Sequence, residues 1–204
     1  MKLLSQTHSP FARKVVVLIH ELGRSDISIE HQETSPTNPN PAVSSLNPLG
    51  KVPVLIMDDE TPLYDSAVIC EYLCSQEDKT PLLPVSPAKR MRALRQQALA
   101  SGMCETGIAI RWEIERRPEH LRYETLRDGL IAKLAASYAH LEQDVPREDE
   151  VTVGTIALAC ALDWAAFREL DQFMPGHENL KKWMEVFSQR SSMRASAYAG
   201  QTHD

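Results

Sequence analysis

The sequence predicts a small α/β domain followed by an all-helical domain. In the first 80 residues, short segments suited to strands alternate with segments whose apolar residues recur at helical spacing. After a stretch that carries Pro81, Pro84 and Pro87, no segment has a convincing strand pattern. We therefore expect an α/β domain over residues 1–80 and a helix bundle over residues 87–204.

The strands and helices of the first half follow a defined order. Ser9 and Pro10 favour a helix start that Gly23 ends, since serine is a good N-cap and proline suits the first helical position. The segment 33–50 is rich in proline, asparagine and serine and is expected to be mostly loop. The order is βαβ and then ββα, with strands at 2–5, 27–31, 52–57 and 61–64 and helices after Ser9 and at 67–76.

Helical patterns fill the second half. A long helix over 88–117 ends at Pro118, and a second is expected over 119–143. Thr152 can cap a third, whose segment 155–167 is nearly all apolar and therefore suits a helix buried on every side. The last expected helix covers 178–188.

Composition limits the class of protein. The 204 residues carry 43% hydrophobic and 25% charged residues, as a folded globular protein does. A net charge of −6 argues against nucleic acid and anionic membranes as partners. Apolar stretches such as 15–19 and 156–162 are far shorter than the roughly 20 residues of a membrane span, and the start MKLLSQTHSP lacks a signal-peptide segment. We expect a cytoplasmic protein.

The cysteines and histidines indicate neither a disulfide framework nor a metal site. Cys70 and Cys74 could share a helix face, but no nearby histidine or cysteine pair completes a ligand set. Together with Cys104 and Cys160 they are interpreted as reduced, buried small hydrophobes. We expect no metal.

Three short segments could carry chemistry, and each also has a purely structural interpretation. Pro53 at the start of a strand indicates either an edge strand or a cis Val52–Pro53 bond that turns the main chain of Val52 toward an extended peptide ligand. Asp65 and Ser66 before a helix form either a simple N-cap or a site for an α-amino-acid head group. Ser9 either caps its helix or donates its hydroxyl to a thiolate.

These segments resemble a bacterial glutathione S-transferase. The resemblance is carried by Ser9-Pro10-Phe11-Ala12-Arg13-Lys14, by 47–55 (NPLGKVPVL) and by 65–73 (DSAVICEYL), in this order. It is highly specific over residues 1–85 and covers the rest in outline. It implies a thioredoxin-like domain followed by an all-α domain, paired as a homodimer, with glutathione as the cofactor.

The resemblance also implies a role for each site residue. Ser9 would hydrogen-bond the sulfur of glutathione, and Val52 beside cis Pro53 would make paired main-chain bonds to the cysteinyl unit. Asp65 and Ser66 would take the γ-glutamyl end, and Lys51 would reach the glycyl carboxylate. Ser9 stands where relatives specialised for disulfide exchange have cysteine, so a mixed disulfide is not expected there.

Three expectations for the helical half are less specific. Thr155 stands where the family's capping motif commonly has aspartate, three residues after Thr152, which predicts altered folding energetics. The electrophile pocket is expected on a helix face that carries Met103, Cys104, Gly107, Ile108 and Arg111, which also fit plain core or dimer contacts. Trp112 and Tyr123 are candidate interface residues.

The favoured function is a transferase in which the thiolate of glutathione attacks a small electrophile or a peroxide. One alternative is a non-enzymatic interaction or stress-response protein on the same fold, because fold alone does not decide function. Another is an isomerase or dehalogenase that uses glutathione as a cofactor at the same site.

Overall fold

The structure is a computed structural model that describes residues 1–77, 81–170 and 172–198. Its sheet has the strand order β2-β1-β3-β4. Strand β1 (Lys2–Ser5) pairs in parallel with β2 (Ser28–His31) and antiparallel with β3 (Val54–Ile56), and β3 pairs antiparallel with β4 (Pro62–Leu63). The predicted thioredoxin-like order of βαβ and then ββα is confirmed; β1 has the predicted bounds, and the other three strands are shorter than expected.

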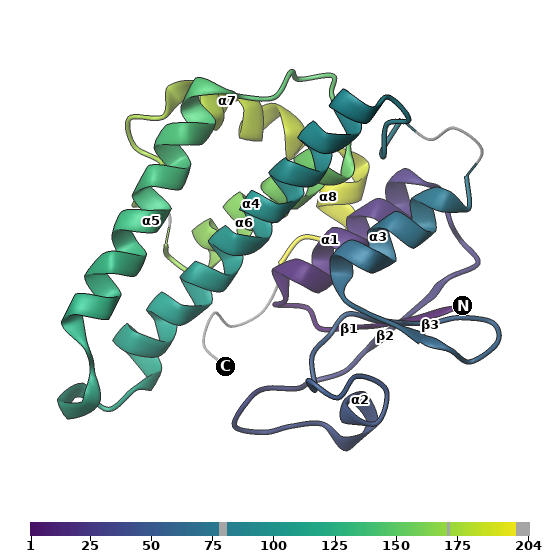
Figure 1. Cartoon of the computed structure of the whole chain (residues 1–204), viewed down its shortest axis with the longest axis horizontal. Coiled ribbons are helices and arrows are strands. Elements are labelled where there is room, and N and C mark those ends of the chain that lie inside the picture. Colours follow the sequence, from purple (N-terminus) through teal and green to yellow (C-terminus); the bar gives the residue numbers. More distant parts are fainter. Residues whose placement is uncertain (78–80, 171, 199–204) are drawn as a thin grey trace.

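Helices cover both faces of this sheet. α1 (Pro10–Glu21) and α3 (Ser66–Ser75) lie on one face, and α2 (Pro41–Ser44) lies on the other (Figure 1). α2 is a single turn inside the segment expected to be mostly loop. It forms because Asn40 accepts a hydrogen bond from the N–H of Ala42 at 3.0 Å, and it buries Val43 in a small apolar cluster with strand residues.

The second half contains the helices predicted from the sequence, with different ends. They are α4 (Pro87–Arg111), η1 (Trp112–Arg116, a π-helical turn), η2 (Glu119–Leu121, a 3₁₀ turn), α5 (Glu124–Gln143), α6 (Val153–Phe167), α7 (Glu178–Phe187) and α8 (Ser191–Ala195). The predicted long helix to residue 117 changes to π geometry after Arg111, and α8 was not predicted. In the part of the chain that is described, no helix is long and apolar enough to cross a membrane.

The second long helix begins at Glu124 and not at residue 119, because a side chain from η1 caps it. The buried carboxylate of Glu113 accepts a hydrogen bond from the N–H of Tyr123 at 3.0 Å. It also forms an ion pair with Arg117 at 2.8 Å. Tyr123 itself offers no side-chain cap. The cap therefore comes from a residue ten positions earlier, which local spacing does not reveal.

The start of α6 confirms Thr152 as an N-cap and gives Thr155 a role. The Oγ1 atom of Thr152 accepts from the N–H of Thr155 at 3.2 Å, and the Oγ1 atom of Thr155 accepts from the N–H of Thr152 at 2.8 Å. This is a capping box, in which each side chain satisfies the other residue's main chain. Thr155 thus supplies the second half of the capping box, so the start of α6 is capped without an acidic residue.

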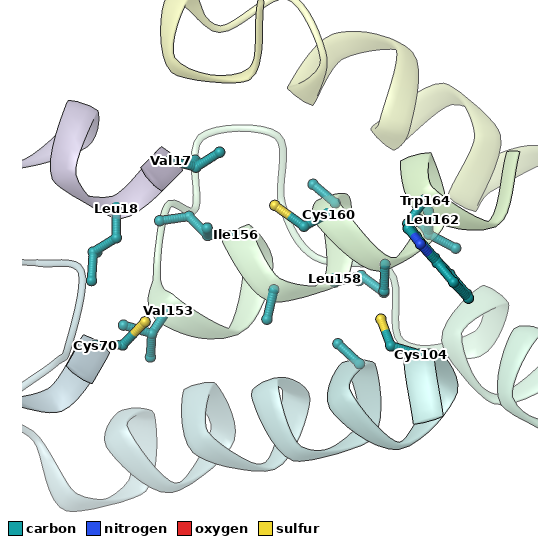
Figure 2. Packing of buried hydrophobic residues seen from close by; sticks show 14 of the residues in the cluster. Val17, Leu18, Cys70, Cys104, Val153, Ile156, Leu158, Cys160, Leu162 and Trp164 are labelled. Carbon is teal, nitrogen blue, oxygen red and sulfur yellow. The ribbon is translucent and has the colours of Figure 1, made fainter. Parts of the chain in front are cut away.

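Helix α6 runs through the middle of the core, with α4 on one side and α1 and α3 on others (Figure 2). From Val153 to Ala165 every residue except Asp163 is buried, but Ala166 is exposed and Phe167 is half-buried, so the predicted enclosure on every side holds for all but the last residues of the helix. Apolar residues of both halves of the chain belong to one continuous cluster. The proposed domain division at residues 80 and 87 therefore separates two segments that share a core.

The four cysteines are free and buried, as predicted. Burial raises the pKa of Cys70 to about 11 and that of Cys160 to about 12. Among the described residues, no group of histidine, cysteine, aspartate or glutamate side chains is placed to hold a metal ion. These thiols therefore act as small apolar side chains, because a protonated thiol is a weak nucleophile.

Two ionic contacts bind the C-terminal helices and α6 to α1. The guanidinium of Arg13, which is almost fully buried, pairs with Asp163 of α6. At the other end of α1, the carboxylate of Glu21 accepts hydrogen bonds from Arg190 at 2.9 and 2.7 Å and from the hydroxyl of Ser192. Both ends of α1 are thus fixed by residues more than 140 positions away.

The contact between α4 and α6 depends on a glycine. A Cβ atom at Gly154 would lie 2.4 Å from the main-chain oxygen of Ala93, so Gly154→Ala must push the two helices apart. We expect a loss of about 2–3 kcal/mol in the free energy of unfolding. Gly102→Ala in α4 is the control, because nothing lies within 4 Å of its added methyl group. Urea unfolding that shows equal stability for both variants would contradict this constraint.

The Glu21 contact predicts a dependence of stability on pH. Hydrogen bonds from Arg190, and then from Ser192, hold the pKa of Glu21 below its usual value of 4.5. Its stabilisation is therefore complete above pH 4.5 and is lost as the pH falls through the lowered pKa. We expect Glu21→Gln to cost about 1–2 kcal/mol at pH 7 and much less at pH 3. Thermal unfolding at both pH values, with the exposed Glu185→Gln as control, checks this; a cost independent of pH would disprove it.

Candidate functional site

A cleft of about 980 Å³ is lined by residues from both halves of the chain. One wall comes from the turn before α1, the loops around α2 and the start of α3. The other comes from the end of α4, from η1 and from the end of α6. All six residues that the sequence predicted for the site line this cleft: Ser9, Lys51, Val52, Pro53, Asp65 and Ser66.

Ser9 is the N-cap of α1, with extended backbone angles of φ −86° and ψ 118°. Its Oγ atom accepts a hydrogen bond from the N–H of Ala12 at 3.2 Å. The hydroxyl hydrogen is not used in that bond and can be donated to a ligand atom in the cleft. The positive end of the α1 dipole lies at the same place, so both the hydroxyl donor and the dipole favour an anion there.

Val52 presents its main chain to the cleft. The Val52–Pro53 bond is cis, as predicted. Within the described residues, the N–H and C=O of Val52 have no hydrogen-bond partner, although its side chain is packed in the small apolar cluster around α2. A donor and an acceptor without partners on one residue suit the main chain of a peptide ligand.

Asn47 holds this loop in place, a role that the sequence interpretation missed. Its buried side chain donates from Nδ2 to the carbonyl of Lys51 at 2.9 Å and accepts from the N–H of Leu49 at 3.1 Å. The side chain of Lys51 is exposed, so only its main chain is fixed. Asparagine followed by Pro48 and Gly50 is a turn signal that could have indicated the role.

Asp65 caps α3 with one carboxylate oxygen. Its Oδ1 atom accepts from the N–H groups of Ala67 at 3.0 Å and Val68 at 3.4 Å. No described residue donates a hydrogen bond to its Oδ2 atom, and the side chain is exposed at the cleft. The two interpretations of this segment are therefore compatible, because the cap uses one oxygen and leaves the other for a cation. Ser66 is the first residue of α3 and is buried.

Of the five residues predicted for the electrophile pocket, two line the cleft and three lie in the core. Ile108 and Arg111 line the cleft. Met103, Cys104 and Gly107 do not line it, since they point into the packed interior, where a Cβ atom at Gly107 would meet the ring of Trp164 at 2.7 Å. The residues share helical spacing, but the rotation of α4 against α6 turns only the face that carries Glu105, Ile108 and Arg111 toward the cleft.

Five residues of this second wall were not assigned to the pocket from the sequence. They are Glu105, Trp112, Arg116, Trp164 and Arg168. The sequence suggested Trp112 only as a candidate interface residue, and the structure places it in the lining of the cleft. No local pattern indicates these residues, because they come together only through the packing of α4, η1 and α6.

Comparisons with known proteins agree with this architecture. A family model described as "Glutathione S-transferase, N-terminal domain" matches residues 8–76, which include every predicted site residue. The uncharacterized GST-like protein YibF of Escherichia coli (strain K12) is 32% identical over 173 residues, which cover 83% of this chain and 84% of that protein.

Solved structures resemble the whole chain. A glutathione transferase family member from Pseudomonas fluorescens Pf-5, crystallised with bound glutathione, is 34% identical with a TM-score of 0.90, over 98% of this chain and 99% of that one. A glutathione S-transferase from Methylobacillus flagellatus KT, with glutathione bound, is 29% identical with a TM-score of 0.85, over 97% of this chain and 99% of that one. The similarity therefore extends through both halves.

Proposed function

The chain belongs to the glutathione S-transferase family, and on this ground we propose that it binds glutathione in the cleft and directs the thiol at a small electrophile or a peroxide. The observation that carries the proposal is the meeting of Ser9, Val52 and Asp65 in one cleft. Glutathione is a substrate in this scheme, because its sulfur becomes part of the product.

Each part of glutathione has a chemically matched group. The γ-glutamyl ammonium would lie against Oδ2 of Asp65, and its carboxylate would lie at the N-terminus of α3 near Ser66. The cysteinyl unit would pair with the free N–H and C=O of Val52 beside Pro53. The flexible, exposed side chain of Lys51 would reach the glycyl carboxylate.

The role of Ser9 is to favour the thiolate. Donation of its hydroxyl hydrogen to sulfur, together with the α1 dipole, stabilises the negative charge. A pKa lowered by two units requires about 2.7 kcal/mol of preferential stabilisation. The sulfur then forms a bond to an electrophilic carbon, the leaving group departs with the bonding electrons, and the thiol proton passes to solvent.

We propose a homodimer in the cytoplasm that serves in detoxification. Exposed apolar side chains lie at Tyr64, Val68 and Met91, and an ion pair between Glu71 and Arg90 joins α3 to α4. A second copy of the chain would cover this surface. The four free thiols suit a reducing compartment.

Glutathione binding is tested by calorimetric titration into the wild-type protein and into Asp65→Asn. Asparagine caps a helix as well as aspartate does, so the variant should remain folded while it loses the charge. We expect the affinity for reduced glutathione to fall about tenfold or more, as for a lost charged hydrogen bond. Asp59→Asn is the control, since Asp59 also caps a turn, through the N–H of Thr61, and lies outside the cleft.

Two results would change this interpretation. Equal affinity in the wild type and in Asp65→Asn would remove Asp65 from the site. No binding of glutathione to the wild-type protein would favour the interaction-protein alternative, in which the fold is kept and the ligand is lost.

The role of Ser9 is tested with Ser9→Gly, because glycine is tolerated as an N-cap and deletes the hydroxyl. We expect the pKa of bound glutathione, followed by the ultraviolet absorbance of its thiolate, to rise by about one to two units. Ser9→Thr keeps a hydroxyl at the cap and should retain most of the lowered pKa. An unchanged pKa and unchanged turnover in Ser9→Gly would show that the hydroxyl takes no part.

A further inference from the structure

Glu105 is a carboxylate of the cleft that the proposed glutathione site does not use. It lies on α4, in the wall formed by α4, η1 and α6, and its side chain is exposed. Among the described residues, none donates a hydrogen bond to this carboxylate or forms an ion pair with it. The residues three and four positions away on the helix carry no charge: Ser101, Gly102, Ile108 and Ala109. A ligand in the cleft therefore meets an unpaired negative charge on this wall.

The three arginines of the same wall are engaged with other groups of the protein. Arg111 is 5% exposed and donates to Oε2 of Glu115 from Nε at 3.1 Å and from Nη2 at 2.8 Å. Arg116 and Arg168 lie over aromatic rings and have further contacts within the protein. None of the three pairs with Glu105, so their positive charges do not neutralise its carboxylate directly.

The packing of α6 on α4 also sets these arginines apart from Glu105. Near the start of α6, a Cβ atom at Gly154 would lie 2.4 Å from the main chain of α4, and near its end the ring of Trp164 would meet a Cβ atom at Gly107 at 2.7 Å. The two helices therefore run in the same direction, and the arginines lie at their C-terminal ends. From Glu105 to Arg111 the helix rises by about 9 Å, which is about one Debye length at physiological ionic strength.

Apolar side chains lie close to Glu105 in this wall. Ile108 is one turn further along α4, and both Ile108 and Trp164 line the cleft. The turn that carries the predicted thiol site is near, because the ring of His8, which also lines the cleft, lies 5.2 Å from the ring of Phe167 at the end of α6. The part of the cleft next to the thiol therefore offers an apolar surface and one unpaired carboxylate.

Bound glutathione would leave the carboxylate of Glu105 unpaired. In the proposed function, Asp65 takes the one cationic group of glutathione, its γ-glutamyl ammonium. Lys51 takes the glycyl carboxylate, and Val52 pairs with the cysteinyl main chain. None of these contacts involves α4, so a positive charge on the second substrate has no competitor at Glu105.

We propose that Glu105 selects electrophiles that carry an ammonium group on a flat apolar body, an inference that rests on the proposed transferase function. The ammonium donates hydrogen bonds to the carboxylate, and Ile108 and Trp164 contact the ring. With N-(2-aminoethyl)-4-chloro-3-nitrobenzamide as probe, the sulfur of glutathione bonds to the ring carbon that carries chlorine. Chloride leaves with the bonding electron pair, the thiol proton goes to solvent, and the ammonium on the opposite side of the ring stays intact.

The experiment compares this probe with N-(2-hydroxyethyl)-4-chloro-3-nitrobenzamide, which has the same shape without the charge. For each compound, kcat/KM is divided by the uncatalysed rate constant with glutathione, which removes any difference in intrinsic reactivity. We expect the ammonium compound to be favoured about fivefold, the upper end for a contact between exposed charges. In Glu105→Gln this preference should fall toward one, and Glu105→Asp should recover part of it.

Glu185→Gln is the matched control, because it removes the same charge from an exposed residue of α7 that does not line the cleft. It should keep the preference of the wild type. In 1 M KCl, where the Debye length is about 3 Å, the wild-type preference should also shrink. A wild type that treats both compounds equally or favours the hydroxyl compound, or a preference that persists in Glu105→Gln, would overturn the inference.

Binding of the two glutathione conjugates, followed by calorimetry, separates this inference from the proposed function and needs no turnover. If reduced glutathione binds and both conjugates bind equally, the ammonium selection is wrong and the glutathione site stands. If glutathione and both conjugates fail to bind, the proposed function and the inference fall together.

Discussion

The close contact of α6 with α4 is the constraint on which the rest of the structure depends. At Gly154 the two helices approach so closely that even a methyl group has no room. The same α6 packs against α1 on another side, so it fixes the end of α4 relative to the start of α1. Residues at these two helix ends line the cleft, which makes its shape a consequence of how α6 is packed.

Residues that hold the local structure also supply the free groups of the cleft. Ser9 accepts from α1 and retains a hydrogen to donate, and Asp65 caps α3 with one oxygen and retains the other. Asn47 fixes the loop before Val52, which lines the cleft. Capping and ligand binding are therefore compatible uses of one side chain, because each cap occupies only part of its hydrogen-bonding capacity.

The thiols of the protein differ from the thiol that the cleft is suited to bind. Burial raises the pKa of Cys70 and Cys160 and keeps both protonated at neutral pH. At Ser9, by contrast, a hydroxyl donor and a helix N-terminus favour negative charge on sulfur. In this scheme the reactive thiol belongs to glutathione, while the cysteines serve the core.

The sequence by itself determined the features that depend on near neighbours. The N-caps at Ser9, Asp65 and Thr152, the enclosed helix α6 and the cis Val52–Pro53 bond were all predicted from residues a few positions apart or from a contiguous motif. Only the tertiary structure decided which side of α4 faces the cleft, how η1 places Trp112 and Arg116, and which remote side chains fix both ends of α1. Helical spacing defines a face but not its rotation against a partner, and that rotation follows from contacts between residues far apart in the chain.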